Sequence, residues 1–98
     1  MKNKKYSEFL NEKLNDPKIA SEYLTSALSE GTIEEFLLAL KSIADSHGGI
    51  SNIAEITELN RQNMYKMLSE EGNPTIKSLN LILKAMGIKI NFEPEEAA

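Results

Sequence analysis

The chain has 98 residues, 41% hydrophobic and 27% charged, with a formal net charge of −4 and no cysteine. This length fits one small domain, and the lack of cysteine excludes disulfides and thiolate metal sites, so a cytoplasmic location is expected. No apolar run approaches the roughly 18 residues of a membrane span, and no hydrophobic region follows the basic start. We therefore expect a soluble protein with no membrane partner.

Residues 1–15 are mostly polar and form the first predicted unit, an extra N-terminal helix. Its apolar side chains, Tyr6, Phe9, Leu10 and Leu14, recur at the spacing of a short amphipathic helix. Tyr6, Phe9 and Leu10 either pack back on the domain or form an exposed anchor for the groove of a partner protein. The segment is therefore a possible partner-binding helix.

Residues 16–92 are predicted to form a helical domain whose first two helices are marked by their ends. Asp16-Pro17 is an N-cap followed by proline at the first helical position, and Gly31 ends that helix. Thr32 to Glu35 reads Thr-Ile-Glu-Glu, a capping box that opens the next helix, and Gly48-Gly49 stops it. The sole histidine, His47, is expected at the surface near that helix end.

Two short amphipathic segments then meet with the spacing of a helix-turn-helix, over about residues 51–69. Their turn is Glu58-Leu59-Asn60, with Leu59 between the helices. Ser51 is predicted to cap the first helix and Asn60 the second. The predicted inward side chains are Ile53, Ala54 and Thr57 in the first helix and Met64, Met67 and Leu68 in the second.

The second helix of this pair presents polar residues outward: Arg61, Gln62, Asn63, Tyr65 and Lys66. These types donate to phosphates or read base edges in a major groove. Plainer interpretations stay open for each. Arg61 and Lys66 are then solvated surface charges, Gln62 is an ordinary surface glutamine, and Tyr65 leans on the core.

The last part of the domain is predicted to be one helix and one strand. Thr75 caps a helix with Ile76, Leu79, Ile82, Leu83 and Met86 inward, which Gly87 closes. Residues 88–92 alternate with period 2, which predicts a short C-terminal β-strand. A lone strand needs a partner, so Ile88, Ile90 and Phe92 are the expected contact of a homodimer. Residues 93–98 are read as an acidic disordered tail.

The fold class predicted from these elements is all-α: five helices, the extra N-terminal helix and the C-terminal strand. Residues 48–92 carry five Lys and Arg against four Glu, a net charge of +1, which is weak for a nucleic-acid binder. No nucleophile–base pair, metal cluster or phosphate loop can be assembled, so no enzyme activity, cofactor or metal is expected.

An ordered set of motifs runs along nearly the whole chain, at residues 16–17, 20–24, 35–40, 48–49, 59–61, 65–69, 71–75 and 84–88. Together they resemble the HigA-like addiction module antidote family, which has an Xre/Cro-type helix-turn-helix in an Xre/lambda-repressor-like fold. The resemblance implies a type II antitoxin that neutralises a toxin of the RelE/ParE superfamily by binding it. It also implies repression of the shared operon through double-stranded operator DNA.

Carried over to this chain, the Xre pattern implies base contacts from Arg61, Gln62 and Lys66. Asn60 and Tyr65 are also expected to contact the DNA. Ser51, Asn73 and Thr75 would lie near helix N-termini against phosphates. One position departs from the wider fold, because residue 58 is Glu where Gly usually accepts a left-handed backbone.

Two alternatives stay open. One is a stand-alone Xre-family repressor without a toxin. The other is a protein-interaction module that has lost DNA binding, which Glu58 and the weak positive charge motivate.

Overall fold

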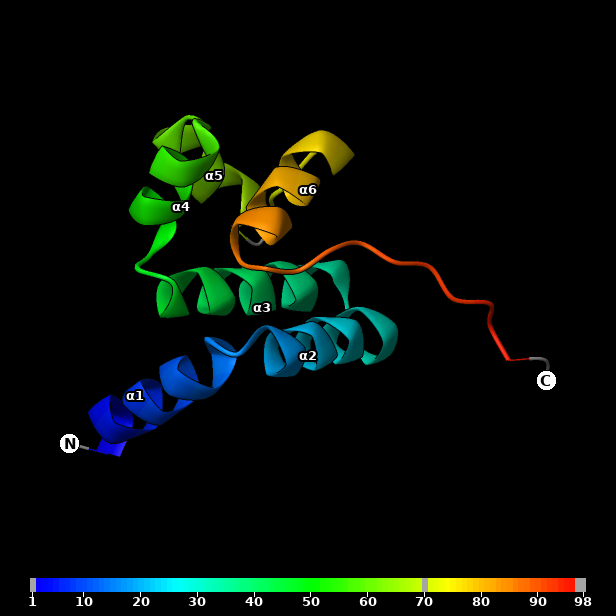
Figure 1. The fold of residues 1–98 in the computed structure, drawn as a ribbon, viewed down its shortest axis with the longest axis horizontal. Helices are drawn as coiled ribbons and strands as arrows, with labels where there is room; N and C mark the ends of the chain where they lie inside the picture. The colour runs from blue at the N-terminus through cyan, green and yellow to red at the C-terminus, as the bar shows by residue number, and fades with distance from the viewer. Residues whose placement is uncertain (1, 70, 97–98) are drawn as a thin grey trace.

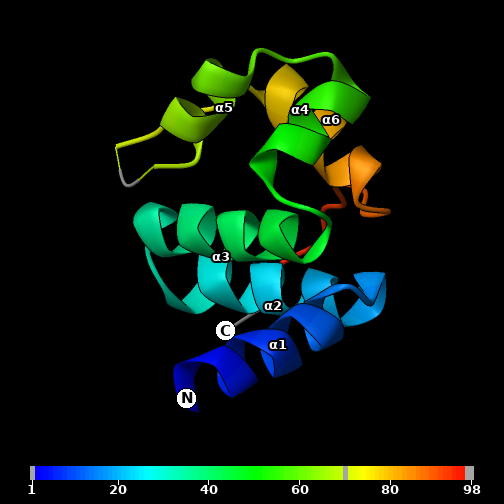
Figure 2. The same ribbon diagram turned by 90° about the vertical axis from the view of Figure 1, so that its left-hand side faces the viewer.

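The chain folds into two layers of helices with α3 between them, as Figure 1 and the perpendicular view in Figure 2 show. The computed structural model describes residues 2–69 and 71–96. Six helices are found there: α1 (Lys2–Leu14), α2 (Pro17–Glu30), α3 (Ile33–Ser46), α4 (Ile50–Thr57), α5 (Arg61–Met67) and α6 (Ile76–Ala85). Helices α1 and α2 lie on one side of α3, and α4, α5 and α6 lie on the other (Figure 1).

Helices α2 and α3 begin at N-caps that follow directly from residue type. The Asp16 carboxylate accepts a hydrogen bond from the Lys18 amide (2.9 Å) at the start of α2. The Thr32 hydroxyl accepts one from the Glu35 amide (3.1 Å) at the start of α3. Both predicted caps are confirmed. The Asn15 side chain also donates to the Ser46 carbonyl (2.8 Å), which ties the α1–α2 junction to the end of α3.

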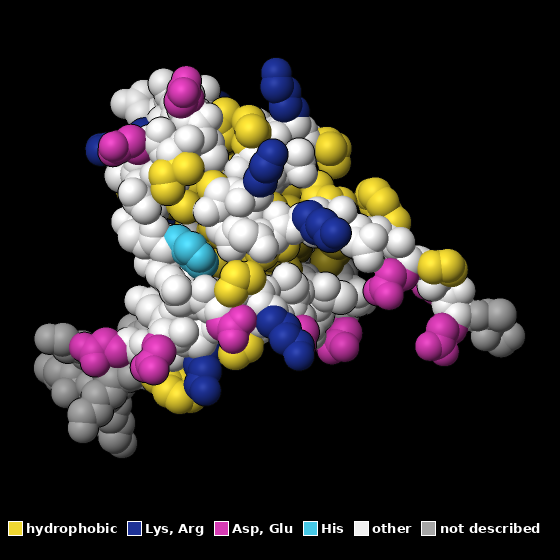
Figure 3. Space-filling model, in the orientation of Figure 1, with side chains coloured by type: hydrophobic (Ala, Val, Ile, Leu, Met, Phe, Trp, Pro, Cys, Tyr) yellow, Lys and Arg dark blue, Asp and Glu magenta, His cyan; other side chains and the backbone are white. Residues whose placement is uncertain are grey.

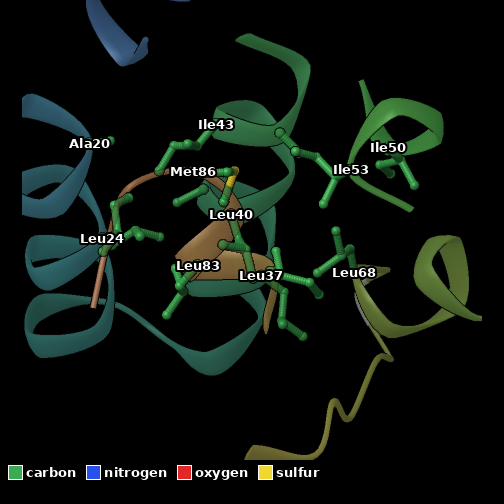
Figure 4. Close-up of a cluster of buried hydrophobic side chains, with 14 of the residues drawn as sticks. Ala20, Leu24, Leu37, Leu40, Ile43, Ile50, Ile53, Leu68, Leu83 and Met86 are labelled. Atoms are coloured by element: carbon green, nitrogen blue, oxygen red, sulfur yellow. The ribbon is translucent and has the colours of Figure 1, made fainter. Parts of the chain in front are cut away.

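One apolar core joins the layers, and α3 supplies its centre (Figure 4). Its buried side chains come from every helix and from the segment after α6. They are Leu14, Ala20, Leu24, Leu37, Ala39, Leu40, Ile43, Ala44, Ile50, Ile53, Ala54, Met64, Leu68, Ile82, Leu83, Met86 and Ile88. Most predicted inward residues are confirmed, but Ile76 at the start of α6 is 74% exposed and was assigned to the core wrongly.

The all-α class is confirmed, but the predicted β-strand over residues 88–92 is wrong. The part of the chain that the structure describes contains no strand. Gly87, with φ +78°, ends α6 in the left-handed region, and the next amide, that of Ile88, donates to the Leu83 carbonyl (2.9 Å). Ile88 is then buried and Ile90 half-buried against the core. The period-2 alternation therefore reflects an extended segment that packs one face on helices.

Residues 93–96 have no regular secondary structure, and the last two residues of the predicted tail lie outside the described residues. Among the residues described, no helix is both long enough and apolar enough to cross a membrane.

Candidate functional site

The turn between α4 and α5 has the left-handed backbone that its sequence position suggested. Glu58 has φ 61° and ψ 20°, and it is the one non-glycine residue with positive φ in the described chain. Thr57 supports the turn, because its hydroxyl donates to the Ile53 carbonyl (2.7 Å) and accepts from the Leu59 amide (3.4 Å). Leu59 is half-buried between the helices, as predicted. The turn is therefore strained at one residue and secured on both sides of it.

Helix α5 is seven residues long and is fixed to the core by its inner face. Met64 is fully buried, and Leu68, which follows the helix, is nearly so. Asn60 caps the start, because its Oδ1 accepts from the Asn63 amide (2.9 Å), which confirms that predicted cap. This hydrogen bond occupies the Asn60 oxygen and leaves its NH₂ group as a donor toward a ligand.

The outer face of α5 carries the polar side chains that the sequence placed there. They are all exposed: Arg61, Gln62, Asn63, Tyr65 and Lys66. Since the backbone of α5 is anchored from below, these side chains project from a rigid platform. The arrangement suits contacts to phosphates and base edges better than a loop would.

Of the helix caps predicted to face phosphates, Thr75 is confirmed as a cap and Ser51 is not. Thr75 caps α6 and accepts from the Ser78 amide (3.0 Å), and Asn73 is exposed in the preceding loop. Ser51 does not cap α4. The cap position is Gly49, which has no side chain to bond, so Ser51 lies in the first turn as an exposed residue.

Charges of both signs lie over α4, α5 and α6. Figure 3 shows acidic and basic side chains interspersed on the face it presents. Glu55 and Glu58 are exposed on α4 and its turn, while Lys77 and Lys84 are exposed on α6. The opposite charges nearly balance over this layer, so its net electrostatic attraction to phosphate is small.

Helix α1 combines the two interpretations that its sequence left open. Leu14 is buried and Leu10 half-buried, so this side of the helix packs on the domain. Tyr6 and Phe9 are exposed, at 65% and 56%. The Lys13 ammonium lies 5.4 Å from the centre of the Phe9 ring, a cation–π contact that covers part of it.

The proposed dimer contact loses its original argument together with the strand. Ile88 is 8% exposed, inside the monomer core, whereas Phe92 is 89% exposed. Ile88 is thus occupied within one chain. Phe92 stays available to a second molecule, as does part of Ile90.

A groove between α2 and α3 is the feature that sequence reasoning missed. It has a volume of about 540 Å³ and is lined by Tyr23, Ser26, Ala27, Glu30, Gly31, Glu35, Leu38, Ala39 and Ser42. In each helix these residues recur at i, i+3, i+4 and i+7, which is one helix face. One sequence signal could have found it: α2 carries the apolar residues Ile19, Ala20, Tyr23, Leu24, Ala27 and Leu28, of which only Ala20 and Leu24 are buried.

The structure offers little to a metal ion in the residues it describes. No group of three or more His, Cys, Asp or Glu side chains there is placed to hold one. His47 follows α3 as its C-terminal cap and is half-buried, with Nδ1 3.0 Å from the Ile43 carbonyl oxygen. The contacts of His47 are therefore with the C-terminal turn of α3.

Comparison with known proteins adds two findings. A family model described as "probable addiction module antidote protein" matches residues 5–94. A protein of Haemophilus influenzae (strain Rd), described only as uncharacterized, is 34% identical over 76 residues, which cover 78% of this chain and 77% of the relative. No solved structure matches the chain significantly.

Proposed function

Because the chain belongs to the family of probable addiction module antidote proteins, we propose that it is the antitoxin of a type II toxin–antitoxin module. In this proposal it neutralises a RelE/ParE-like toxin by direct binding and represses its own operon through α4 and α5. Both acts are stoichiometric and need no catalysis. The match over residues 5–94 supports assigning both layers, rather than α4 and α5 alone, to the antidote function.

The observation that carries the DNA half is the two-sided construction of α5. Met64 fixes the helix from inside, and Arg61, Gln62 and Lys66 are exposed outside. A seven-residue helix is about 10 Å long and reaches only a few base pairs, so one copy reads too little sequence. We therefore propose a homodimer on an operator of Xre type, with half-sites about 34–36 Å apart or a multiple of that.

A gel shift with the upstream promoter fragment tests this half. Arg61→Ala should weaken the complex by about 5- to 150-fold for each subunit that loses a bidentate base contact. Lys18→Ala removes an equal charge from exposed α2 and is the matched control. Equal affinity of the two variants, with unchanged melting temperatures, would show that α5 does not read DNA.

Co-expression with the product of the adjoining reading frame, followed by co-purification, tests the toxin half. Tyr6 and Phe9 are one exposed apolar surface that the toxin could bind. Deleting α1 is a poor test, because it also removes buried Leu14. The double variant Tyr6→Ala/Phe9→Ala leaves the core intact, and toxin neutralisation that survives it undiminished would remove this surface from the proposal.

A second function is favoured by one observation, the exposed Glu58 carboxylate in the α4–α5 turn. With a net charge of only +1 over residues 48–92, the domain would then bind protein alone. A promoter fragment that gives no salt-dependent complex, with or without the co-purified partner, would favour this alternative.

A further inference from the structure

The α2–α3 groove is lined by apolar and hydroxyl side chains and has an acidic rim. Tyr23 and Leu38 are exposed along it, and the small residues Ala27 and Ala39 let another backbone come close. The charged side chains that line it, Glu30 and Glu35, are both acidic. A partly apolar surface with this rim suits an occupant that combines apolar and basic side chains.

The acidic rim is partly preorganised. The Thr32 hydroxyl donates to one oxygen of Glu35 (3.3 Å), so the N-cap residue of α3 also contacts this carboxylate. A carboxylate accepts about four hydrogen bonds, which leaves Glu35 capacity for a cation. Glu30, the last residue of α2, is exposed at the same end of the groove. The two carboxylates therefore define the end that a basic side chain would approach.

The length of the groove matches two turns of a helix. Its lining on α2 runs from Tyr23 to Glu30, which is about 10 Å or two helical turns. A helix lying between two others presents side chains at i, i+3, i+4 and i+7, the spacing that α2 and α3 present here.

We propose that this groove is the toxin-binding site, and that its occupant is an amphipathic helix of the toxin. One apolar face of that helix covers Leu38 and Tyr23, and a Lys or Arg meets Glu30 and Glu35. The inference rests on the proposed antitoxin function and names the surface that performs it.

Matched variants of the full chain test this assignment. Leu38 and Leu28 have equal exposure, 52% and 51%, but only Leu38 lines the groove. Glu30 and Asp45 are both exposed acids in the last turn of a helix, and only Glu30 lines the groove. The two leucine variants therefore remove similar exposed apolar side chains, and the two acidic variants make the same change of charge. Basic residues at these helix ends are favourable, so the charge reversals should leave folding intact.

The measurement is calorimetric titration with the purified product of the adjoining reading frame. We expect Leu38→Ser and Glu30→Lys each to lower affinity by about fivefold or more, and Leu28→Ser and Asp45→Lys by less than about twofold. The Glu30→Lys effect should shrink at high salt. Equal affinity of all four variants, or a loss only in Tyr6→Ala/Phe9→Ala, would overturn the groove assignment and leave the antitoxin proposal standing.

Two other outcomes are distinguishable. If Leu38→Ser turns a dimer into a monomer in sedimentation while toxin affinity is unchanged, a second copy of the chain fills the groove and the inference is wrong. If the wild-type chain does not bind the neighbouring product at all, the antitoxin proposal fails, and the groove assignment fails with it.

Discussion

Substitutions at Glu58 can separate the effect of backbone strain on stability from the effect of its negative charge at the α4–α5 turn. A non-glycine residue in the left-handed region costs about 1–2 kcal/mol, and glycine at the same place loses about 0.5–1 kcal/mol of additional backbone entropy. Because Glu58 has φ 61°, Glu58→Gly should raise the free energy of unfolding by about 0.5–1 kcal/mol. For a domain of this size that is about 2–8 °C in melting temperature.

Glu55→Gly is the control, since Glu55 is equally acidic and exposed but lies inside α4. Glycine there should lower the free energy of unfolding by about 0.5 kcal/mol. Thermal unfolding followed by circular dichroism should thus show shifts of opposite sign for the loss of the same carboxylate. A Glu58→Gly chain that melts at or below the wild type would refute the strain argument.

Glu58→Gln completes the set, because it keeps the strained backbone and removes the charge. Its free energy of unfolding should stay within about 0.5 kcal/mol of the wild type. Its affinity for the promoter fragment should rise as much as that of Glu58→Gly, if the carboxylate faces phosphate. A rise in Glu58→Gly alone would assign the effect to the backbone.

Three further predictions concern stability in urea. Asn60→Ala should lower the free energy of unfolding by about 1 kcal/mol, because it removes the N-cap of α5. Ser51→Ala should change it by less than about 0.5 kcal/mol, because Ser51 is not a cap. Equal losses would contradict Gly49 as the N-cap of α4. Gly72→Ala should cost about 1–3 kcal/mol, because a Cβ would collide with the Met67 carbonyl, and a loss below about 0.5 kcal/mol would show that the loop moves freely. Met64→Ala should cost about 2–5 kcal/mol, and amide exchange should show α5 loosening first; protection equal to that of α3 would refute this.

Local chemistry explains which elements the sequence predicted well. Caps at Asp16, Thr32, Asn60 and Thr75 each depend on a side chain bonding an amide two or three residues away, so residue type was sufficient. Ser51 failed because a glycine with φ 93° began the helix two residues earlier. The residue at which α4 begins depends on how α3 ends, and the capping preference of serine does not contain that information.

Features that depend on packing between elements could not be read from the pattern. The alternation at residues 88–92 was real, but it arose from Ile88 and Ile90 lying on helices rather than from pairing with a strand. The α2–α3 groove needs two helices at a particular offset, and only the surplus apolar residues of α2 pointed to it. The outer face of α5 was predicted because a helix of known register has only one side opposite its buried residues.

The position of α3 between the layers has a genetic consequence. Its buried residues, such as Leu37 and Leu40, support α4–α6, and its Leu38 and Ala39 form part of the groove. Alleles altered on the α5 surface should lose repression but still protect the cell, and groove alleles should do the reverse. Alleles altered in the α3 core should lose both phenotypes together. A screen for alleles that lose only one phenotype should therefore yield no substitution at the buried residues of α3.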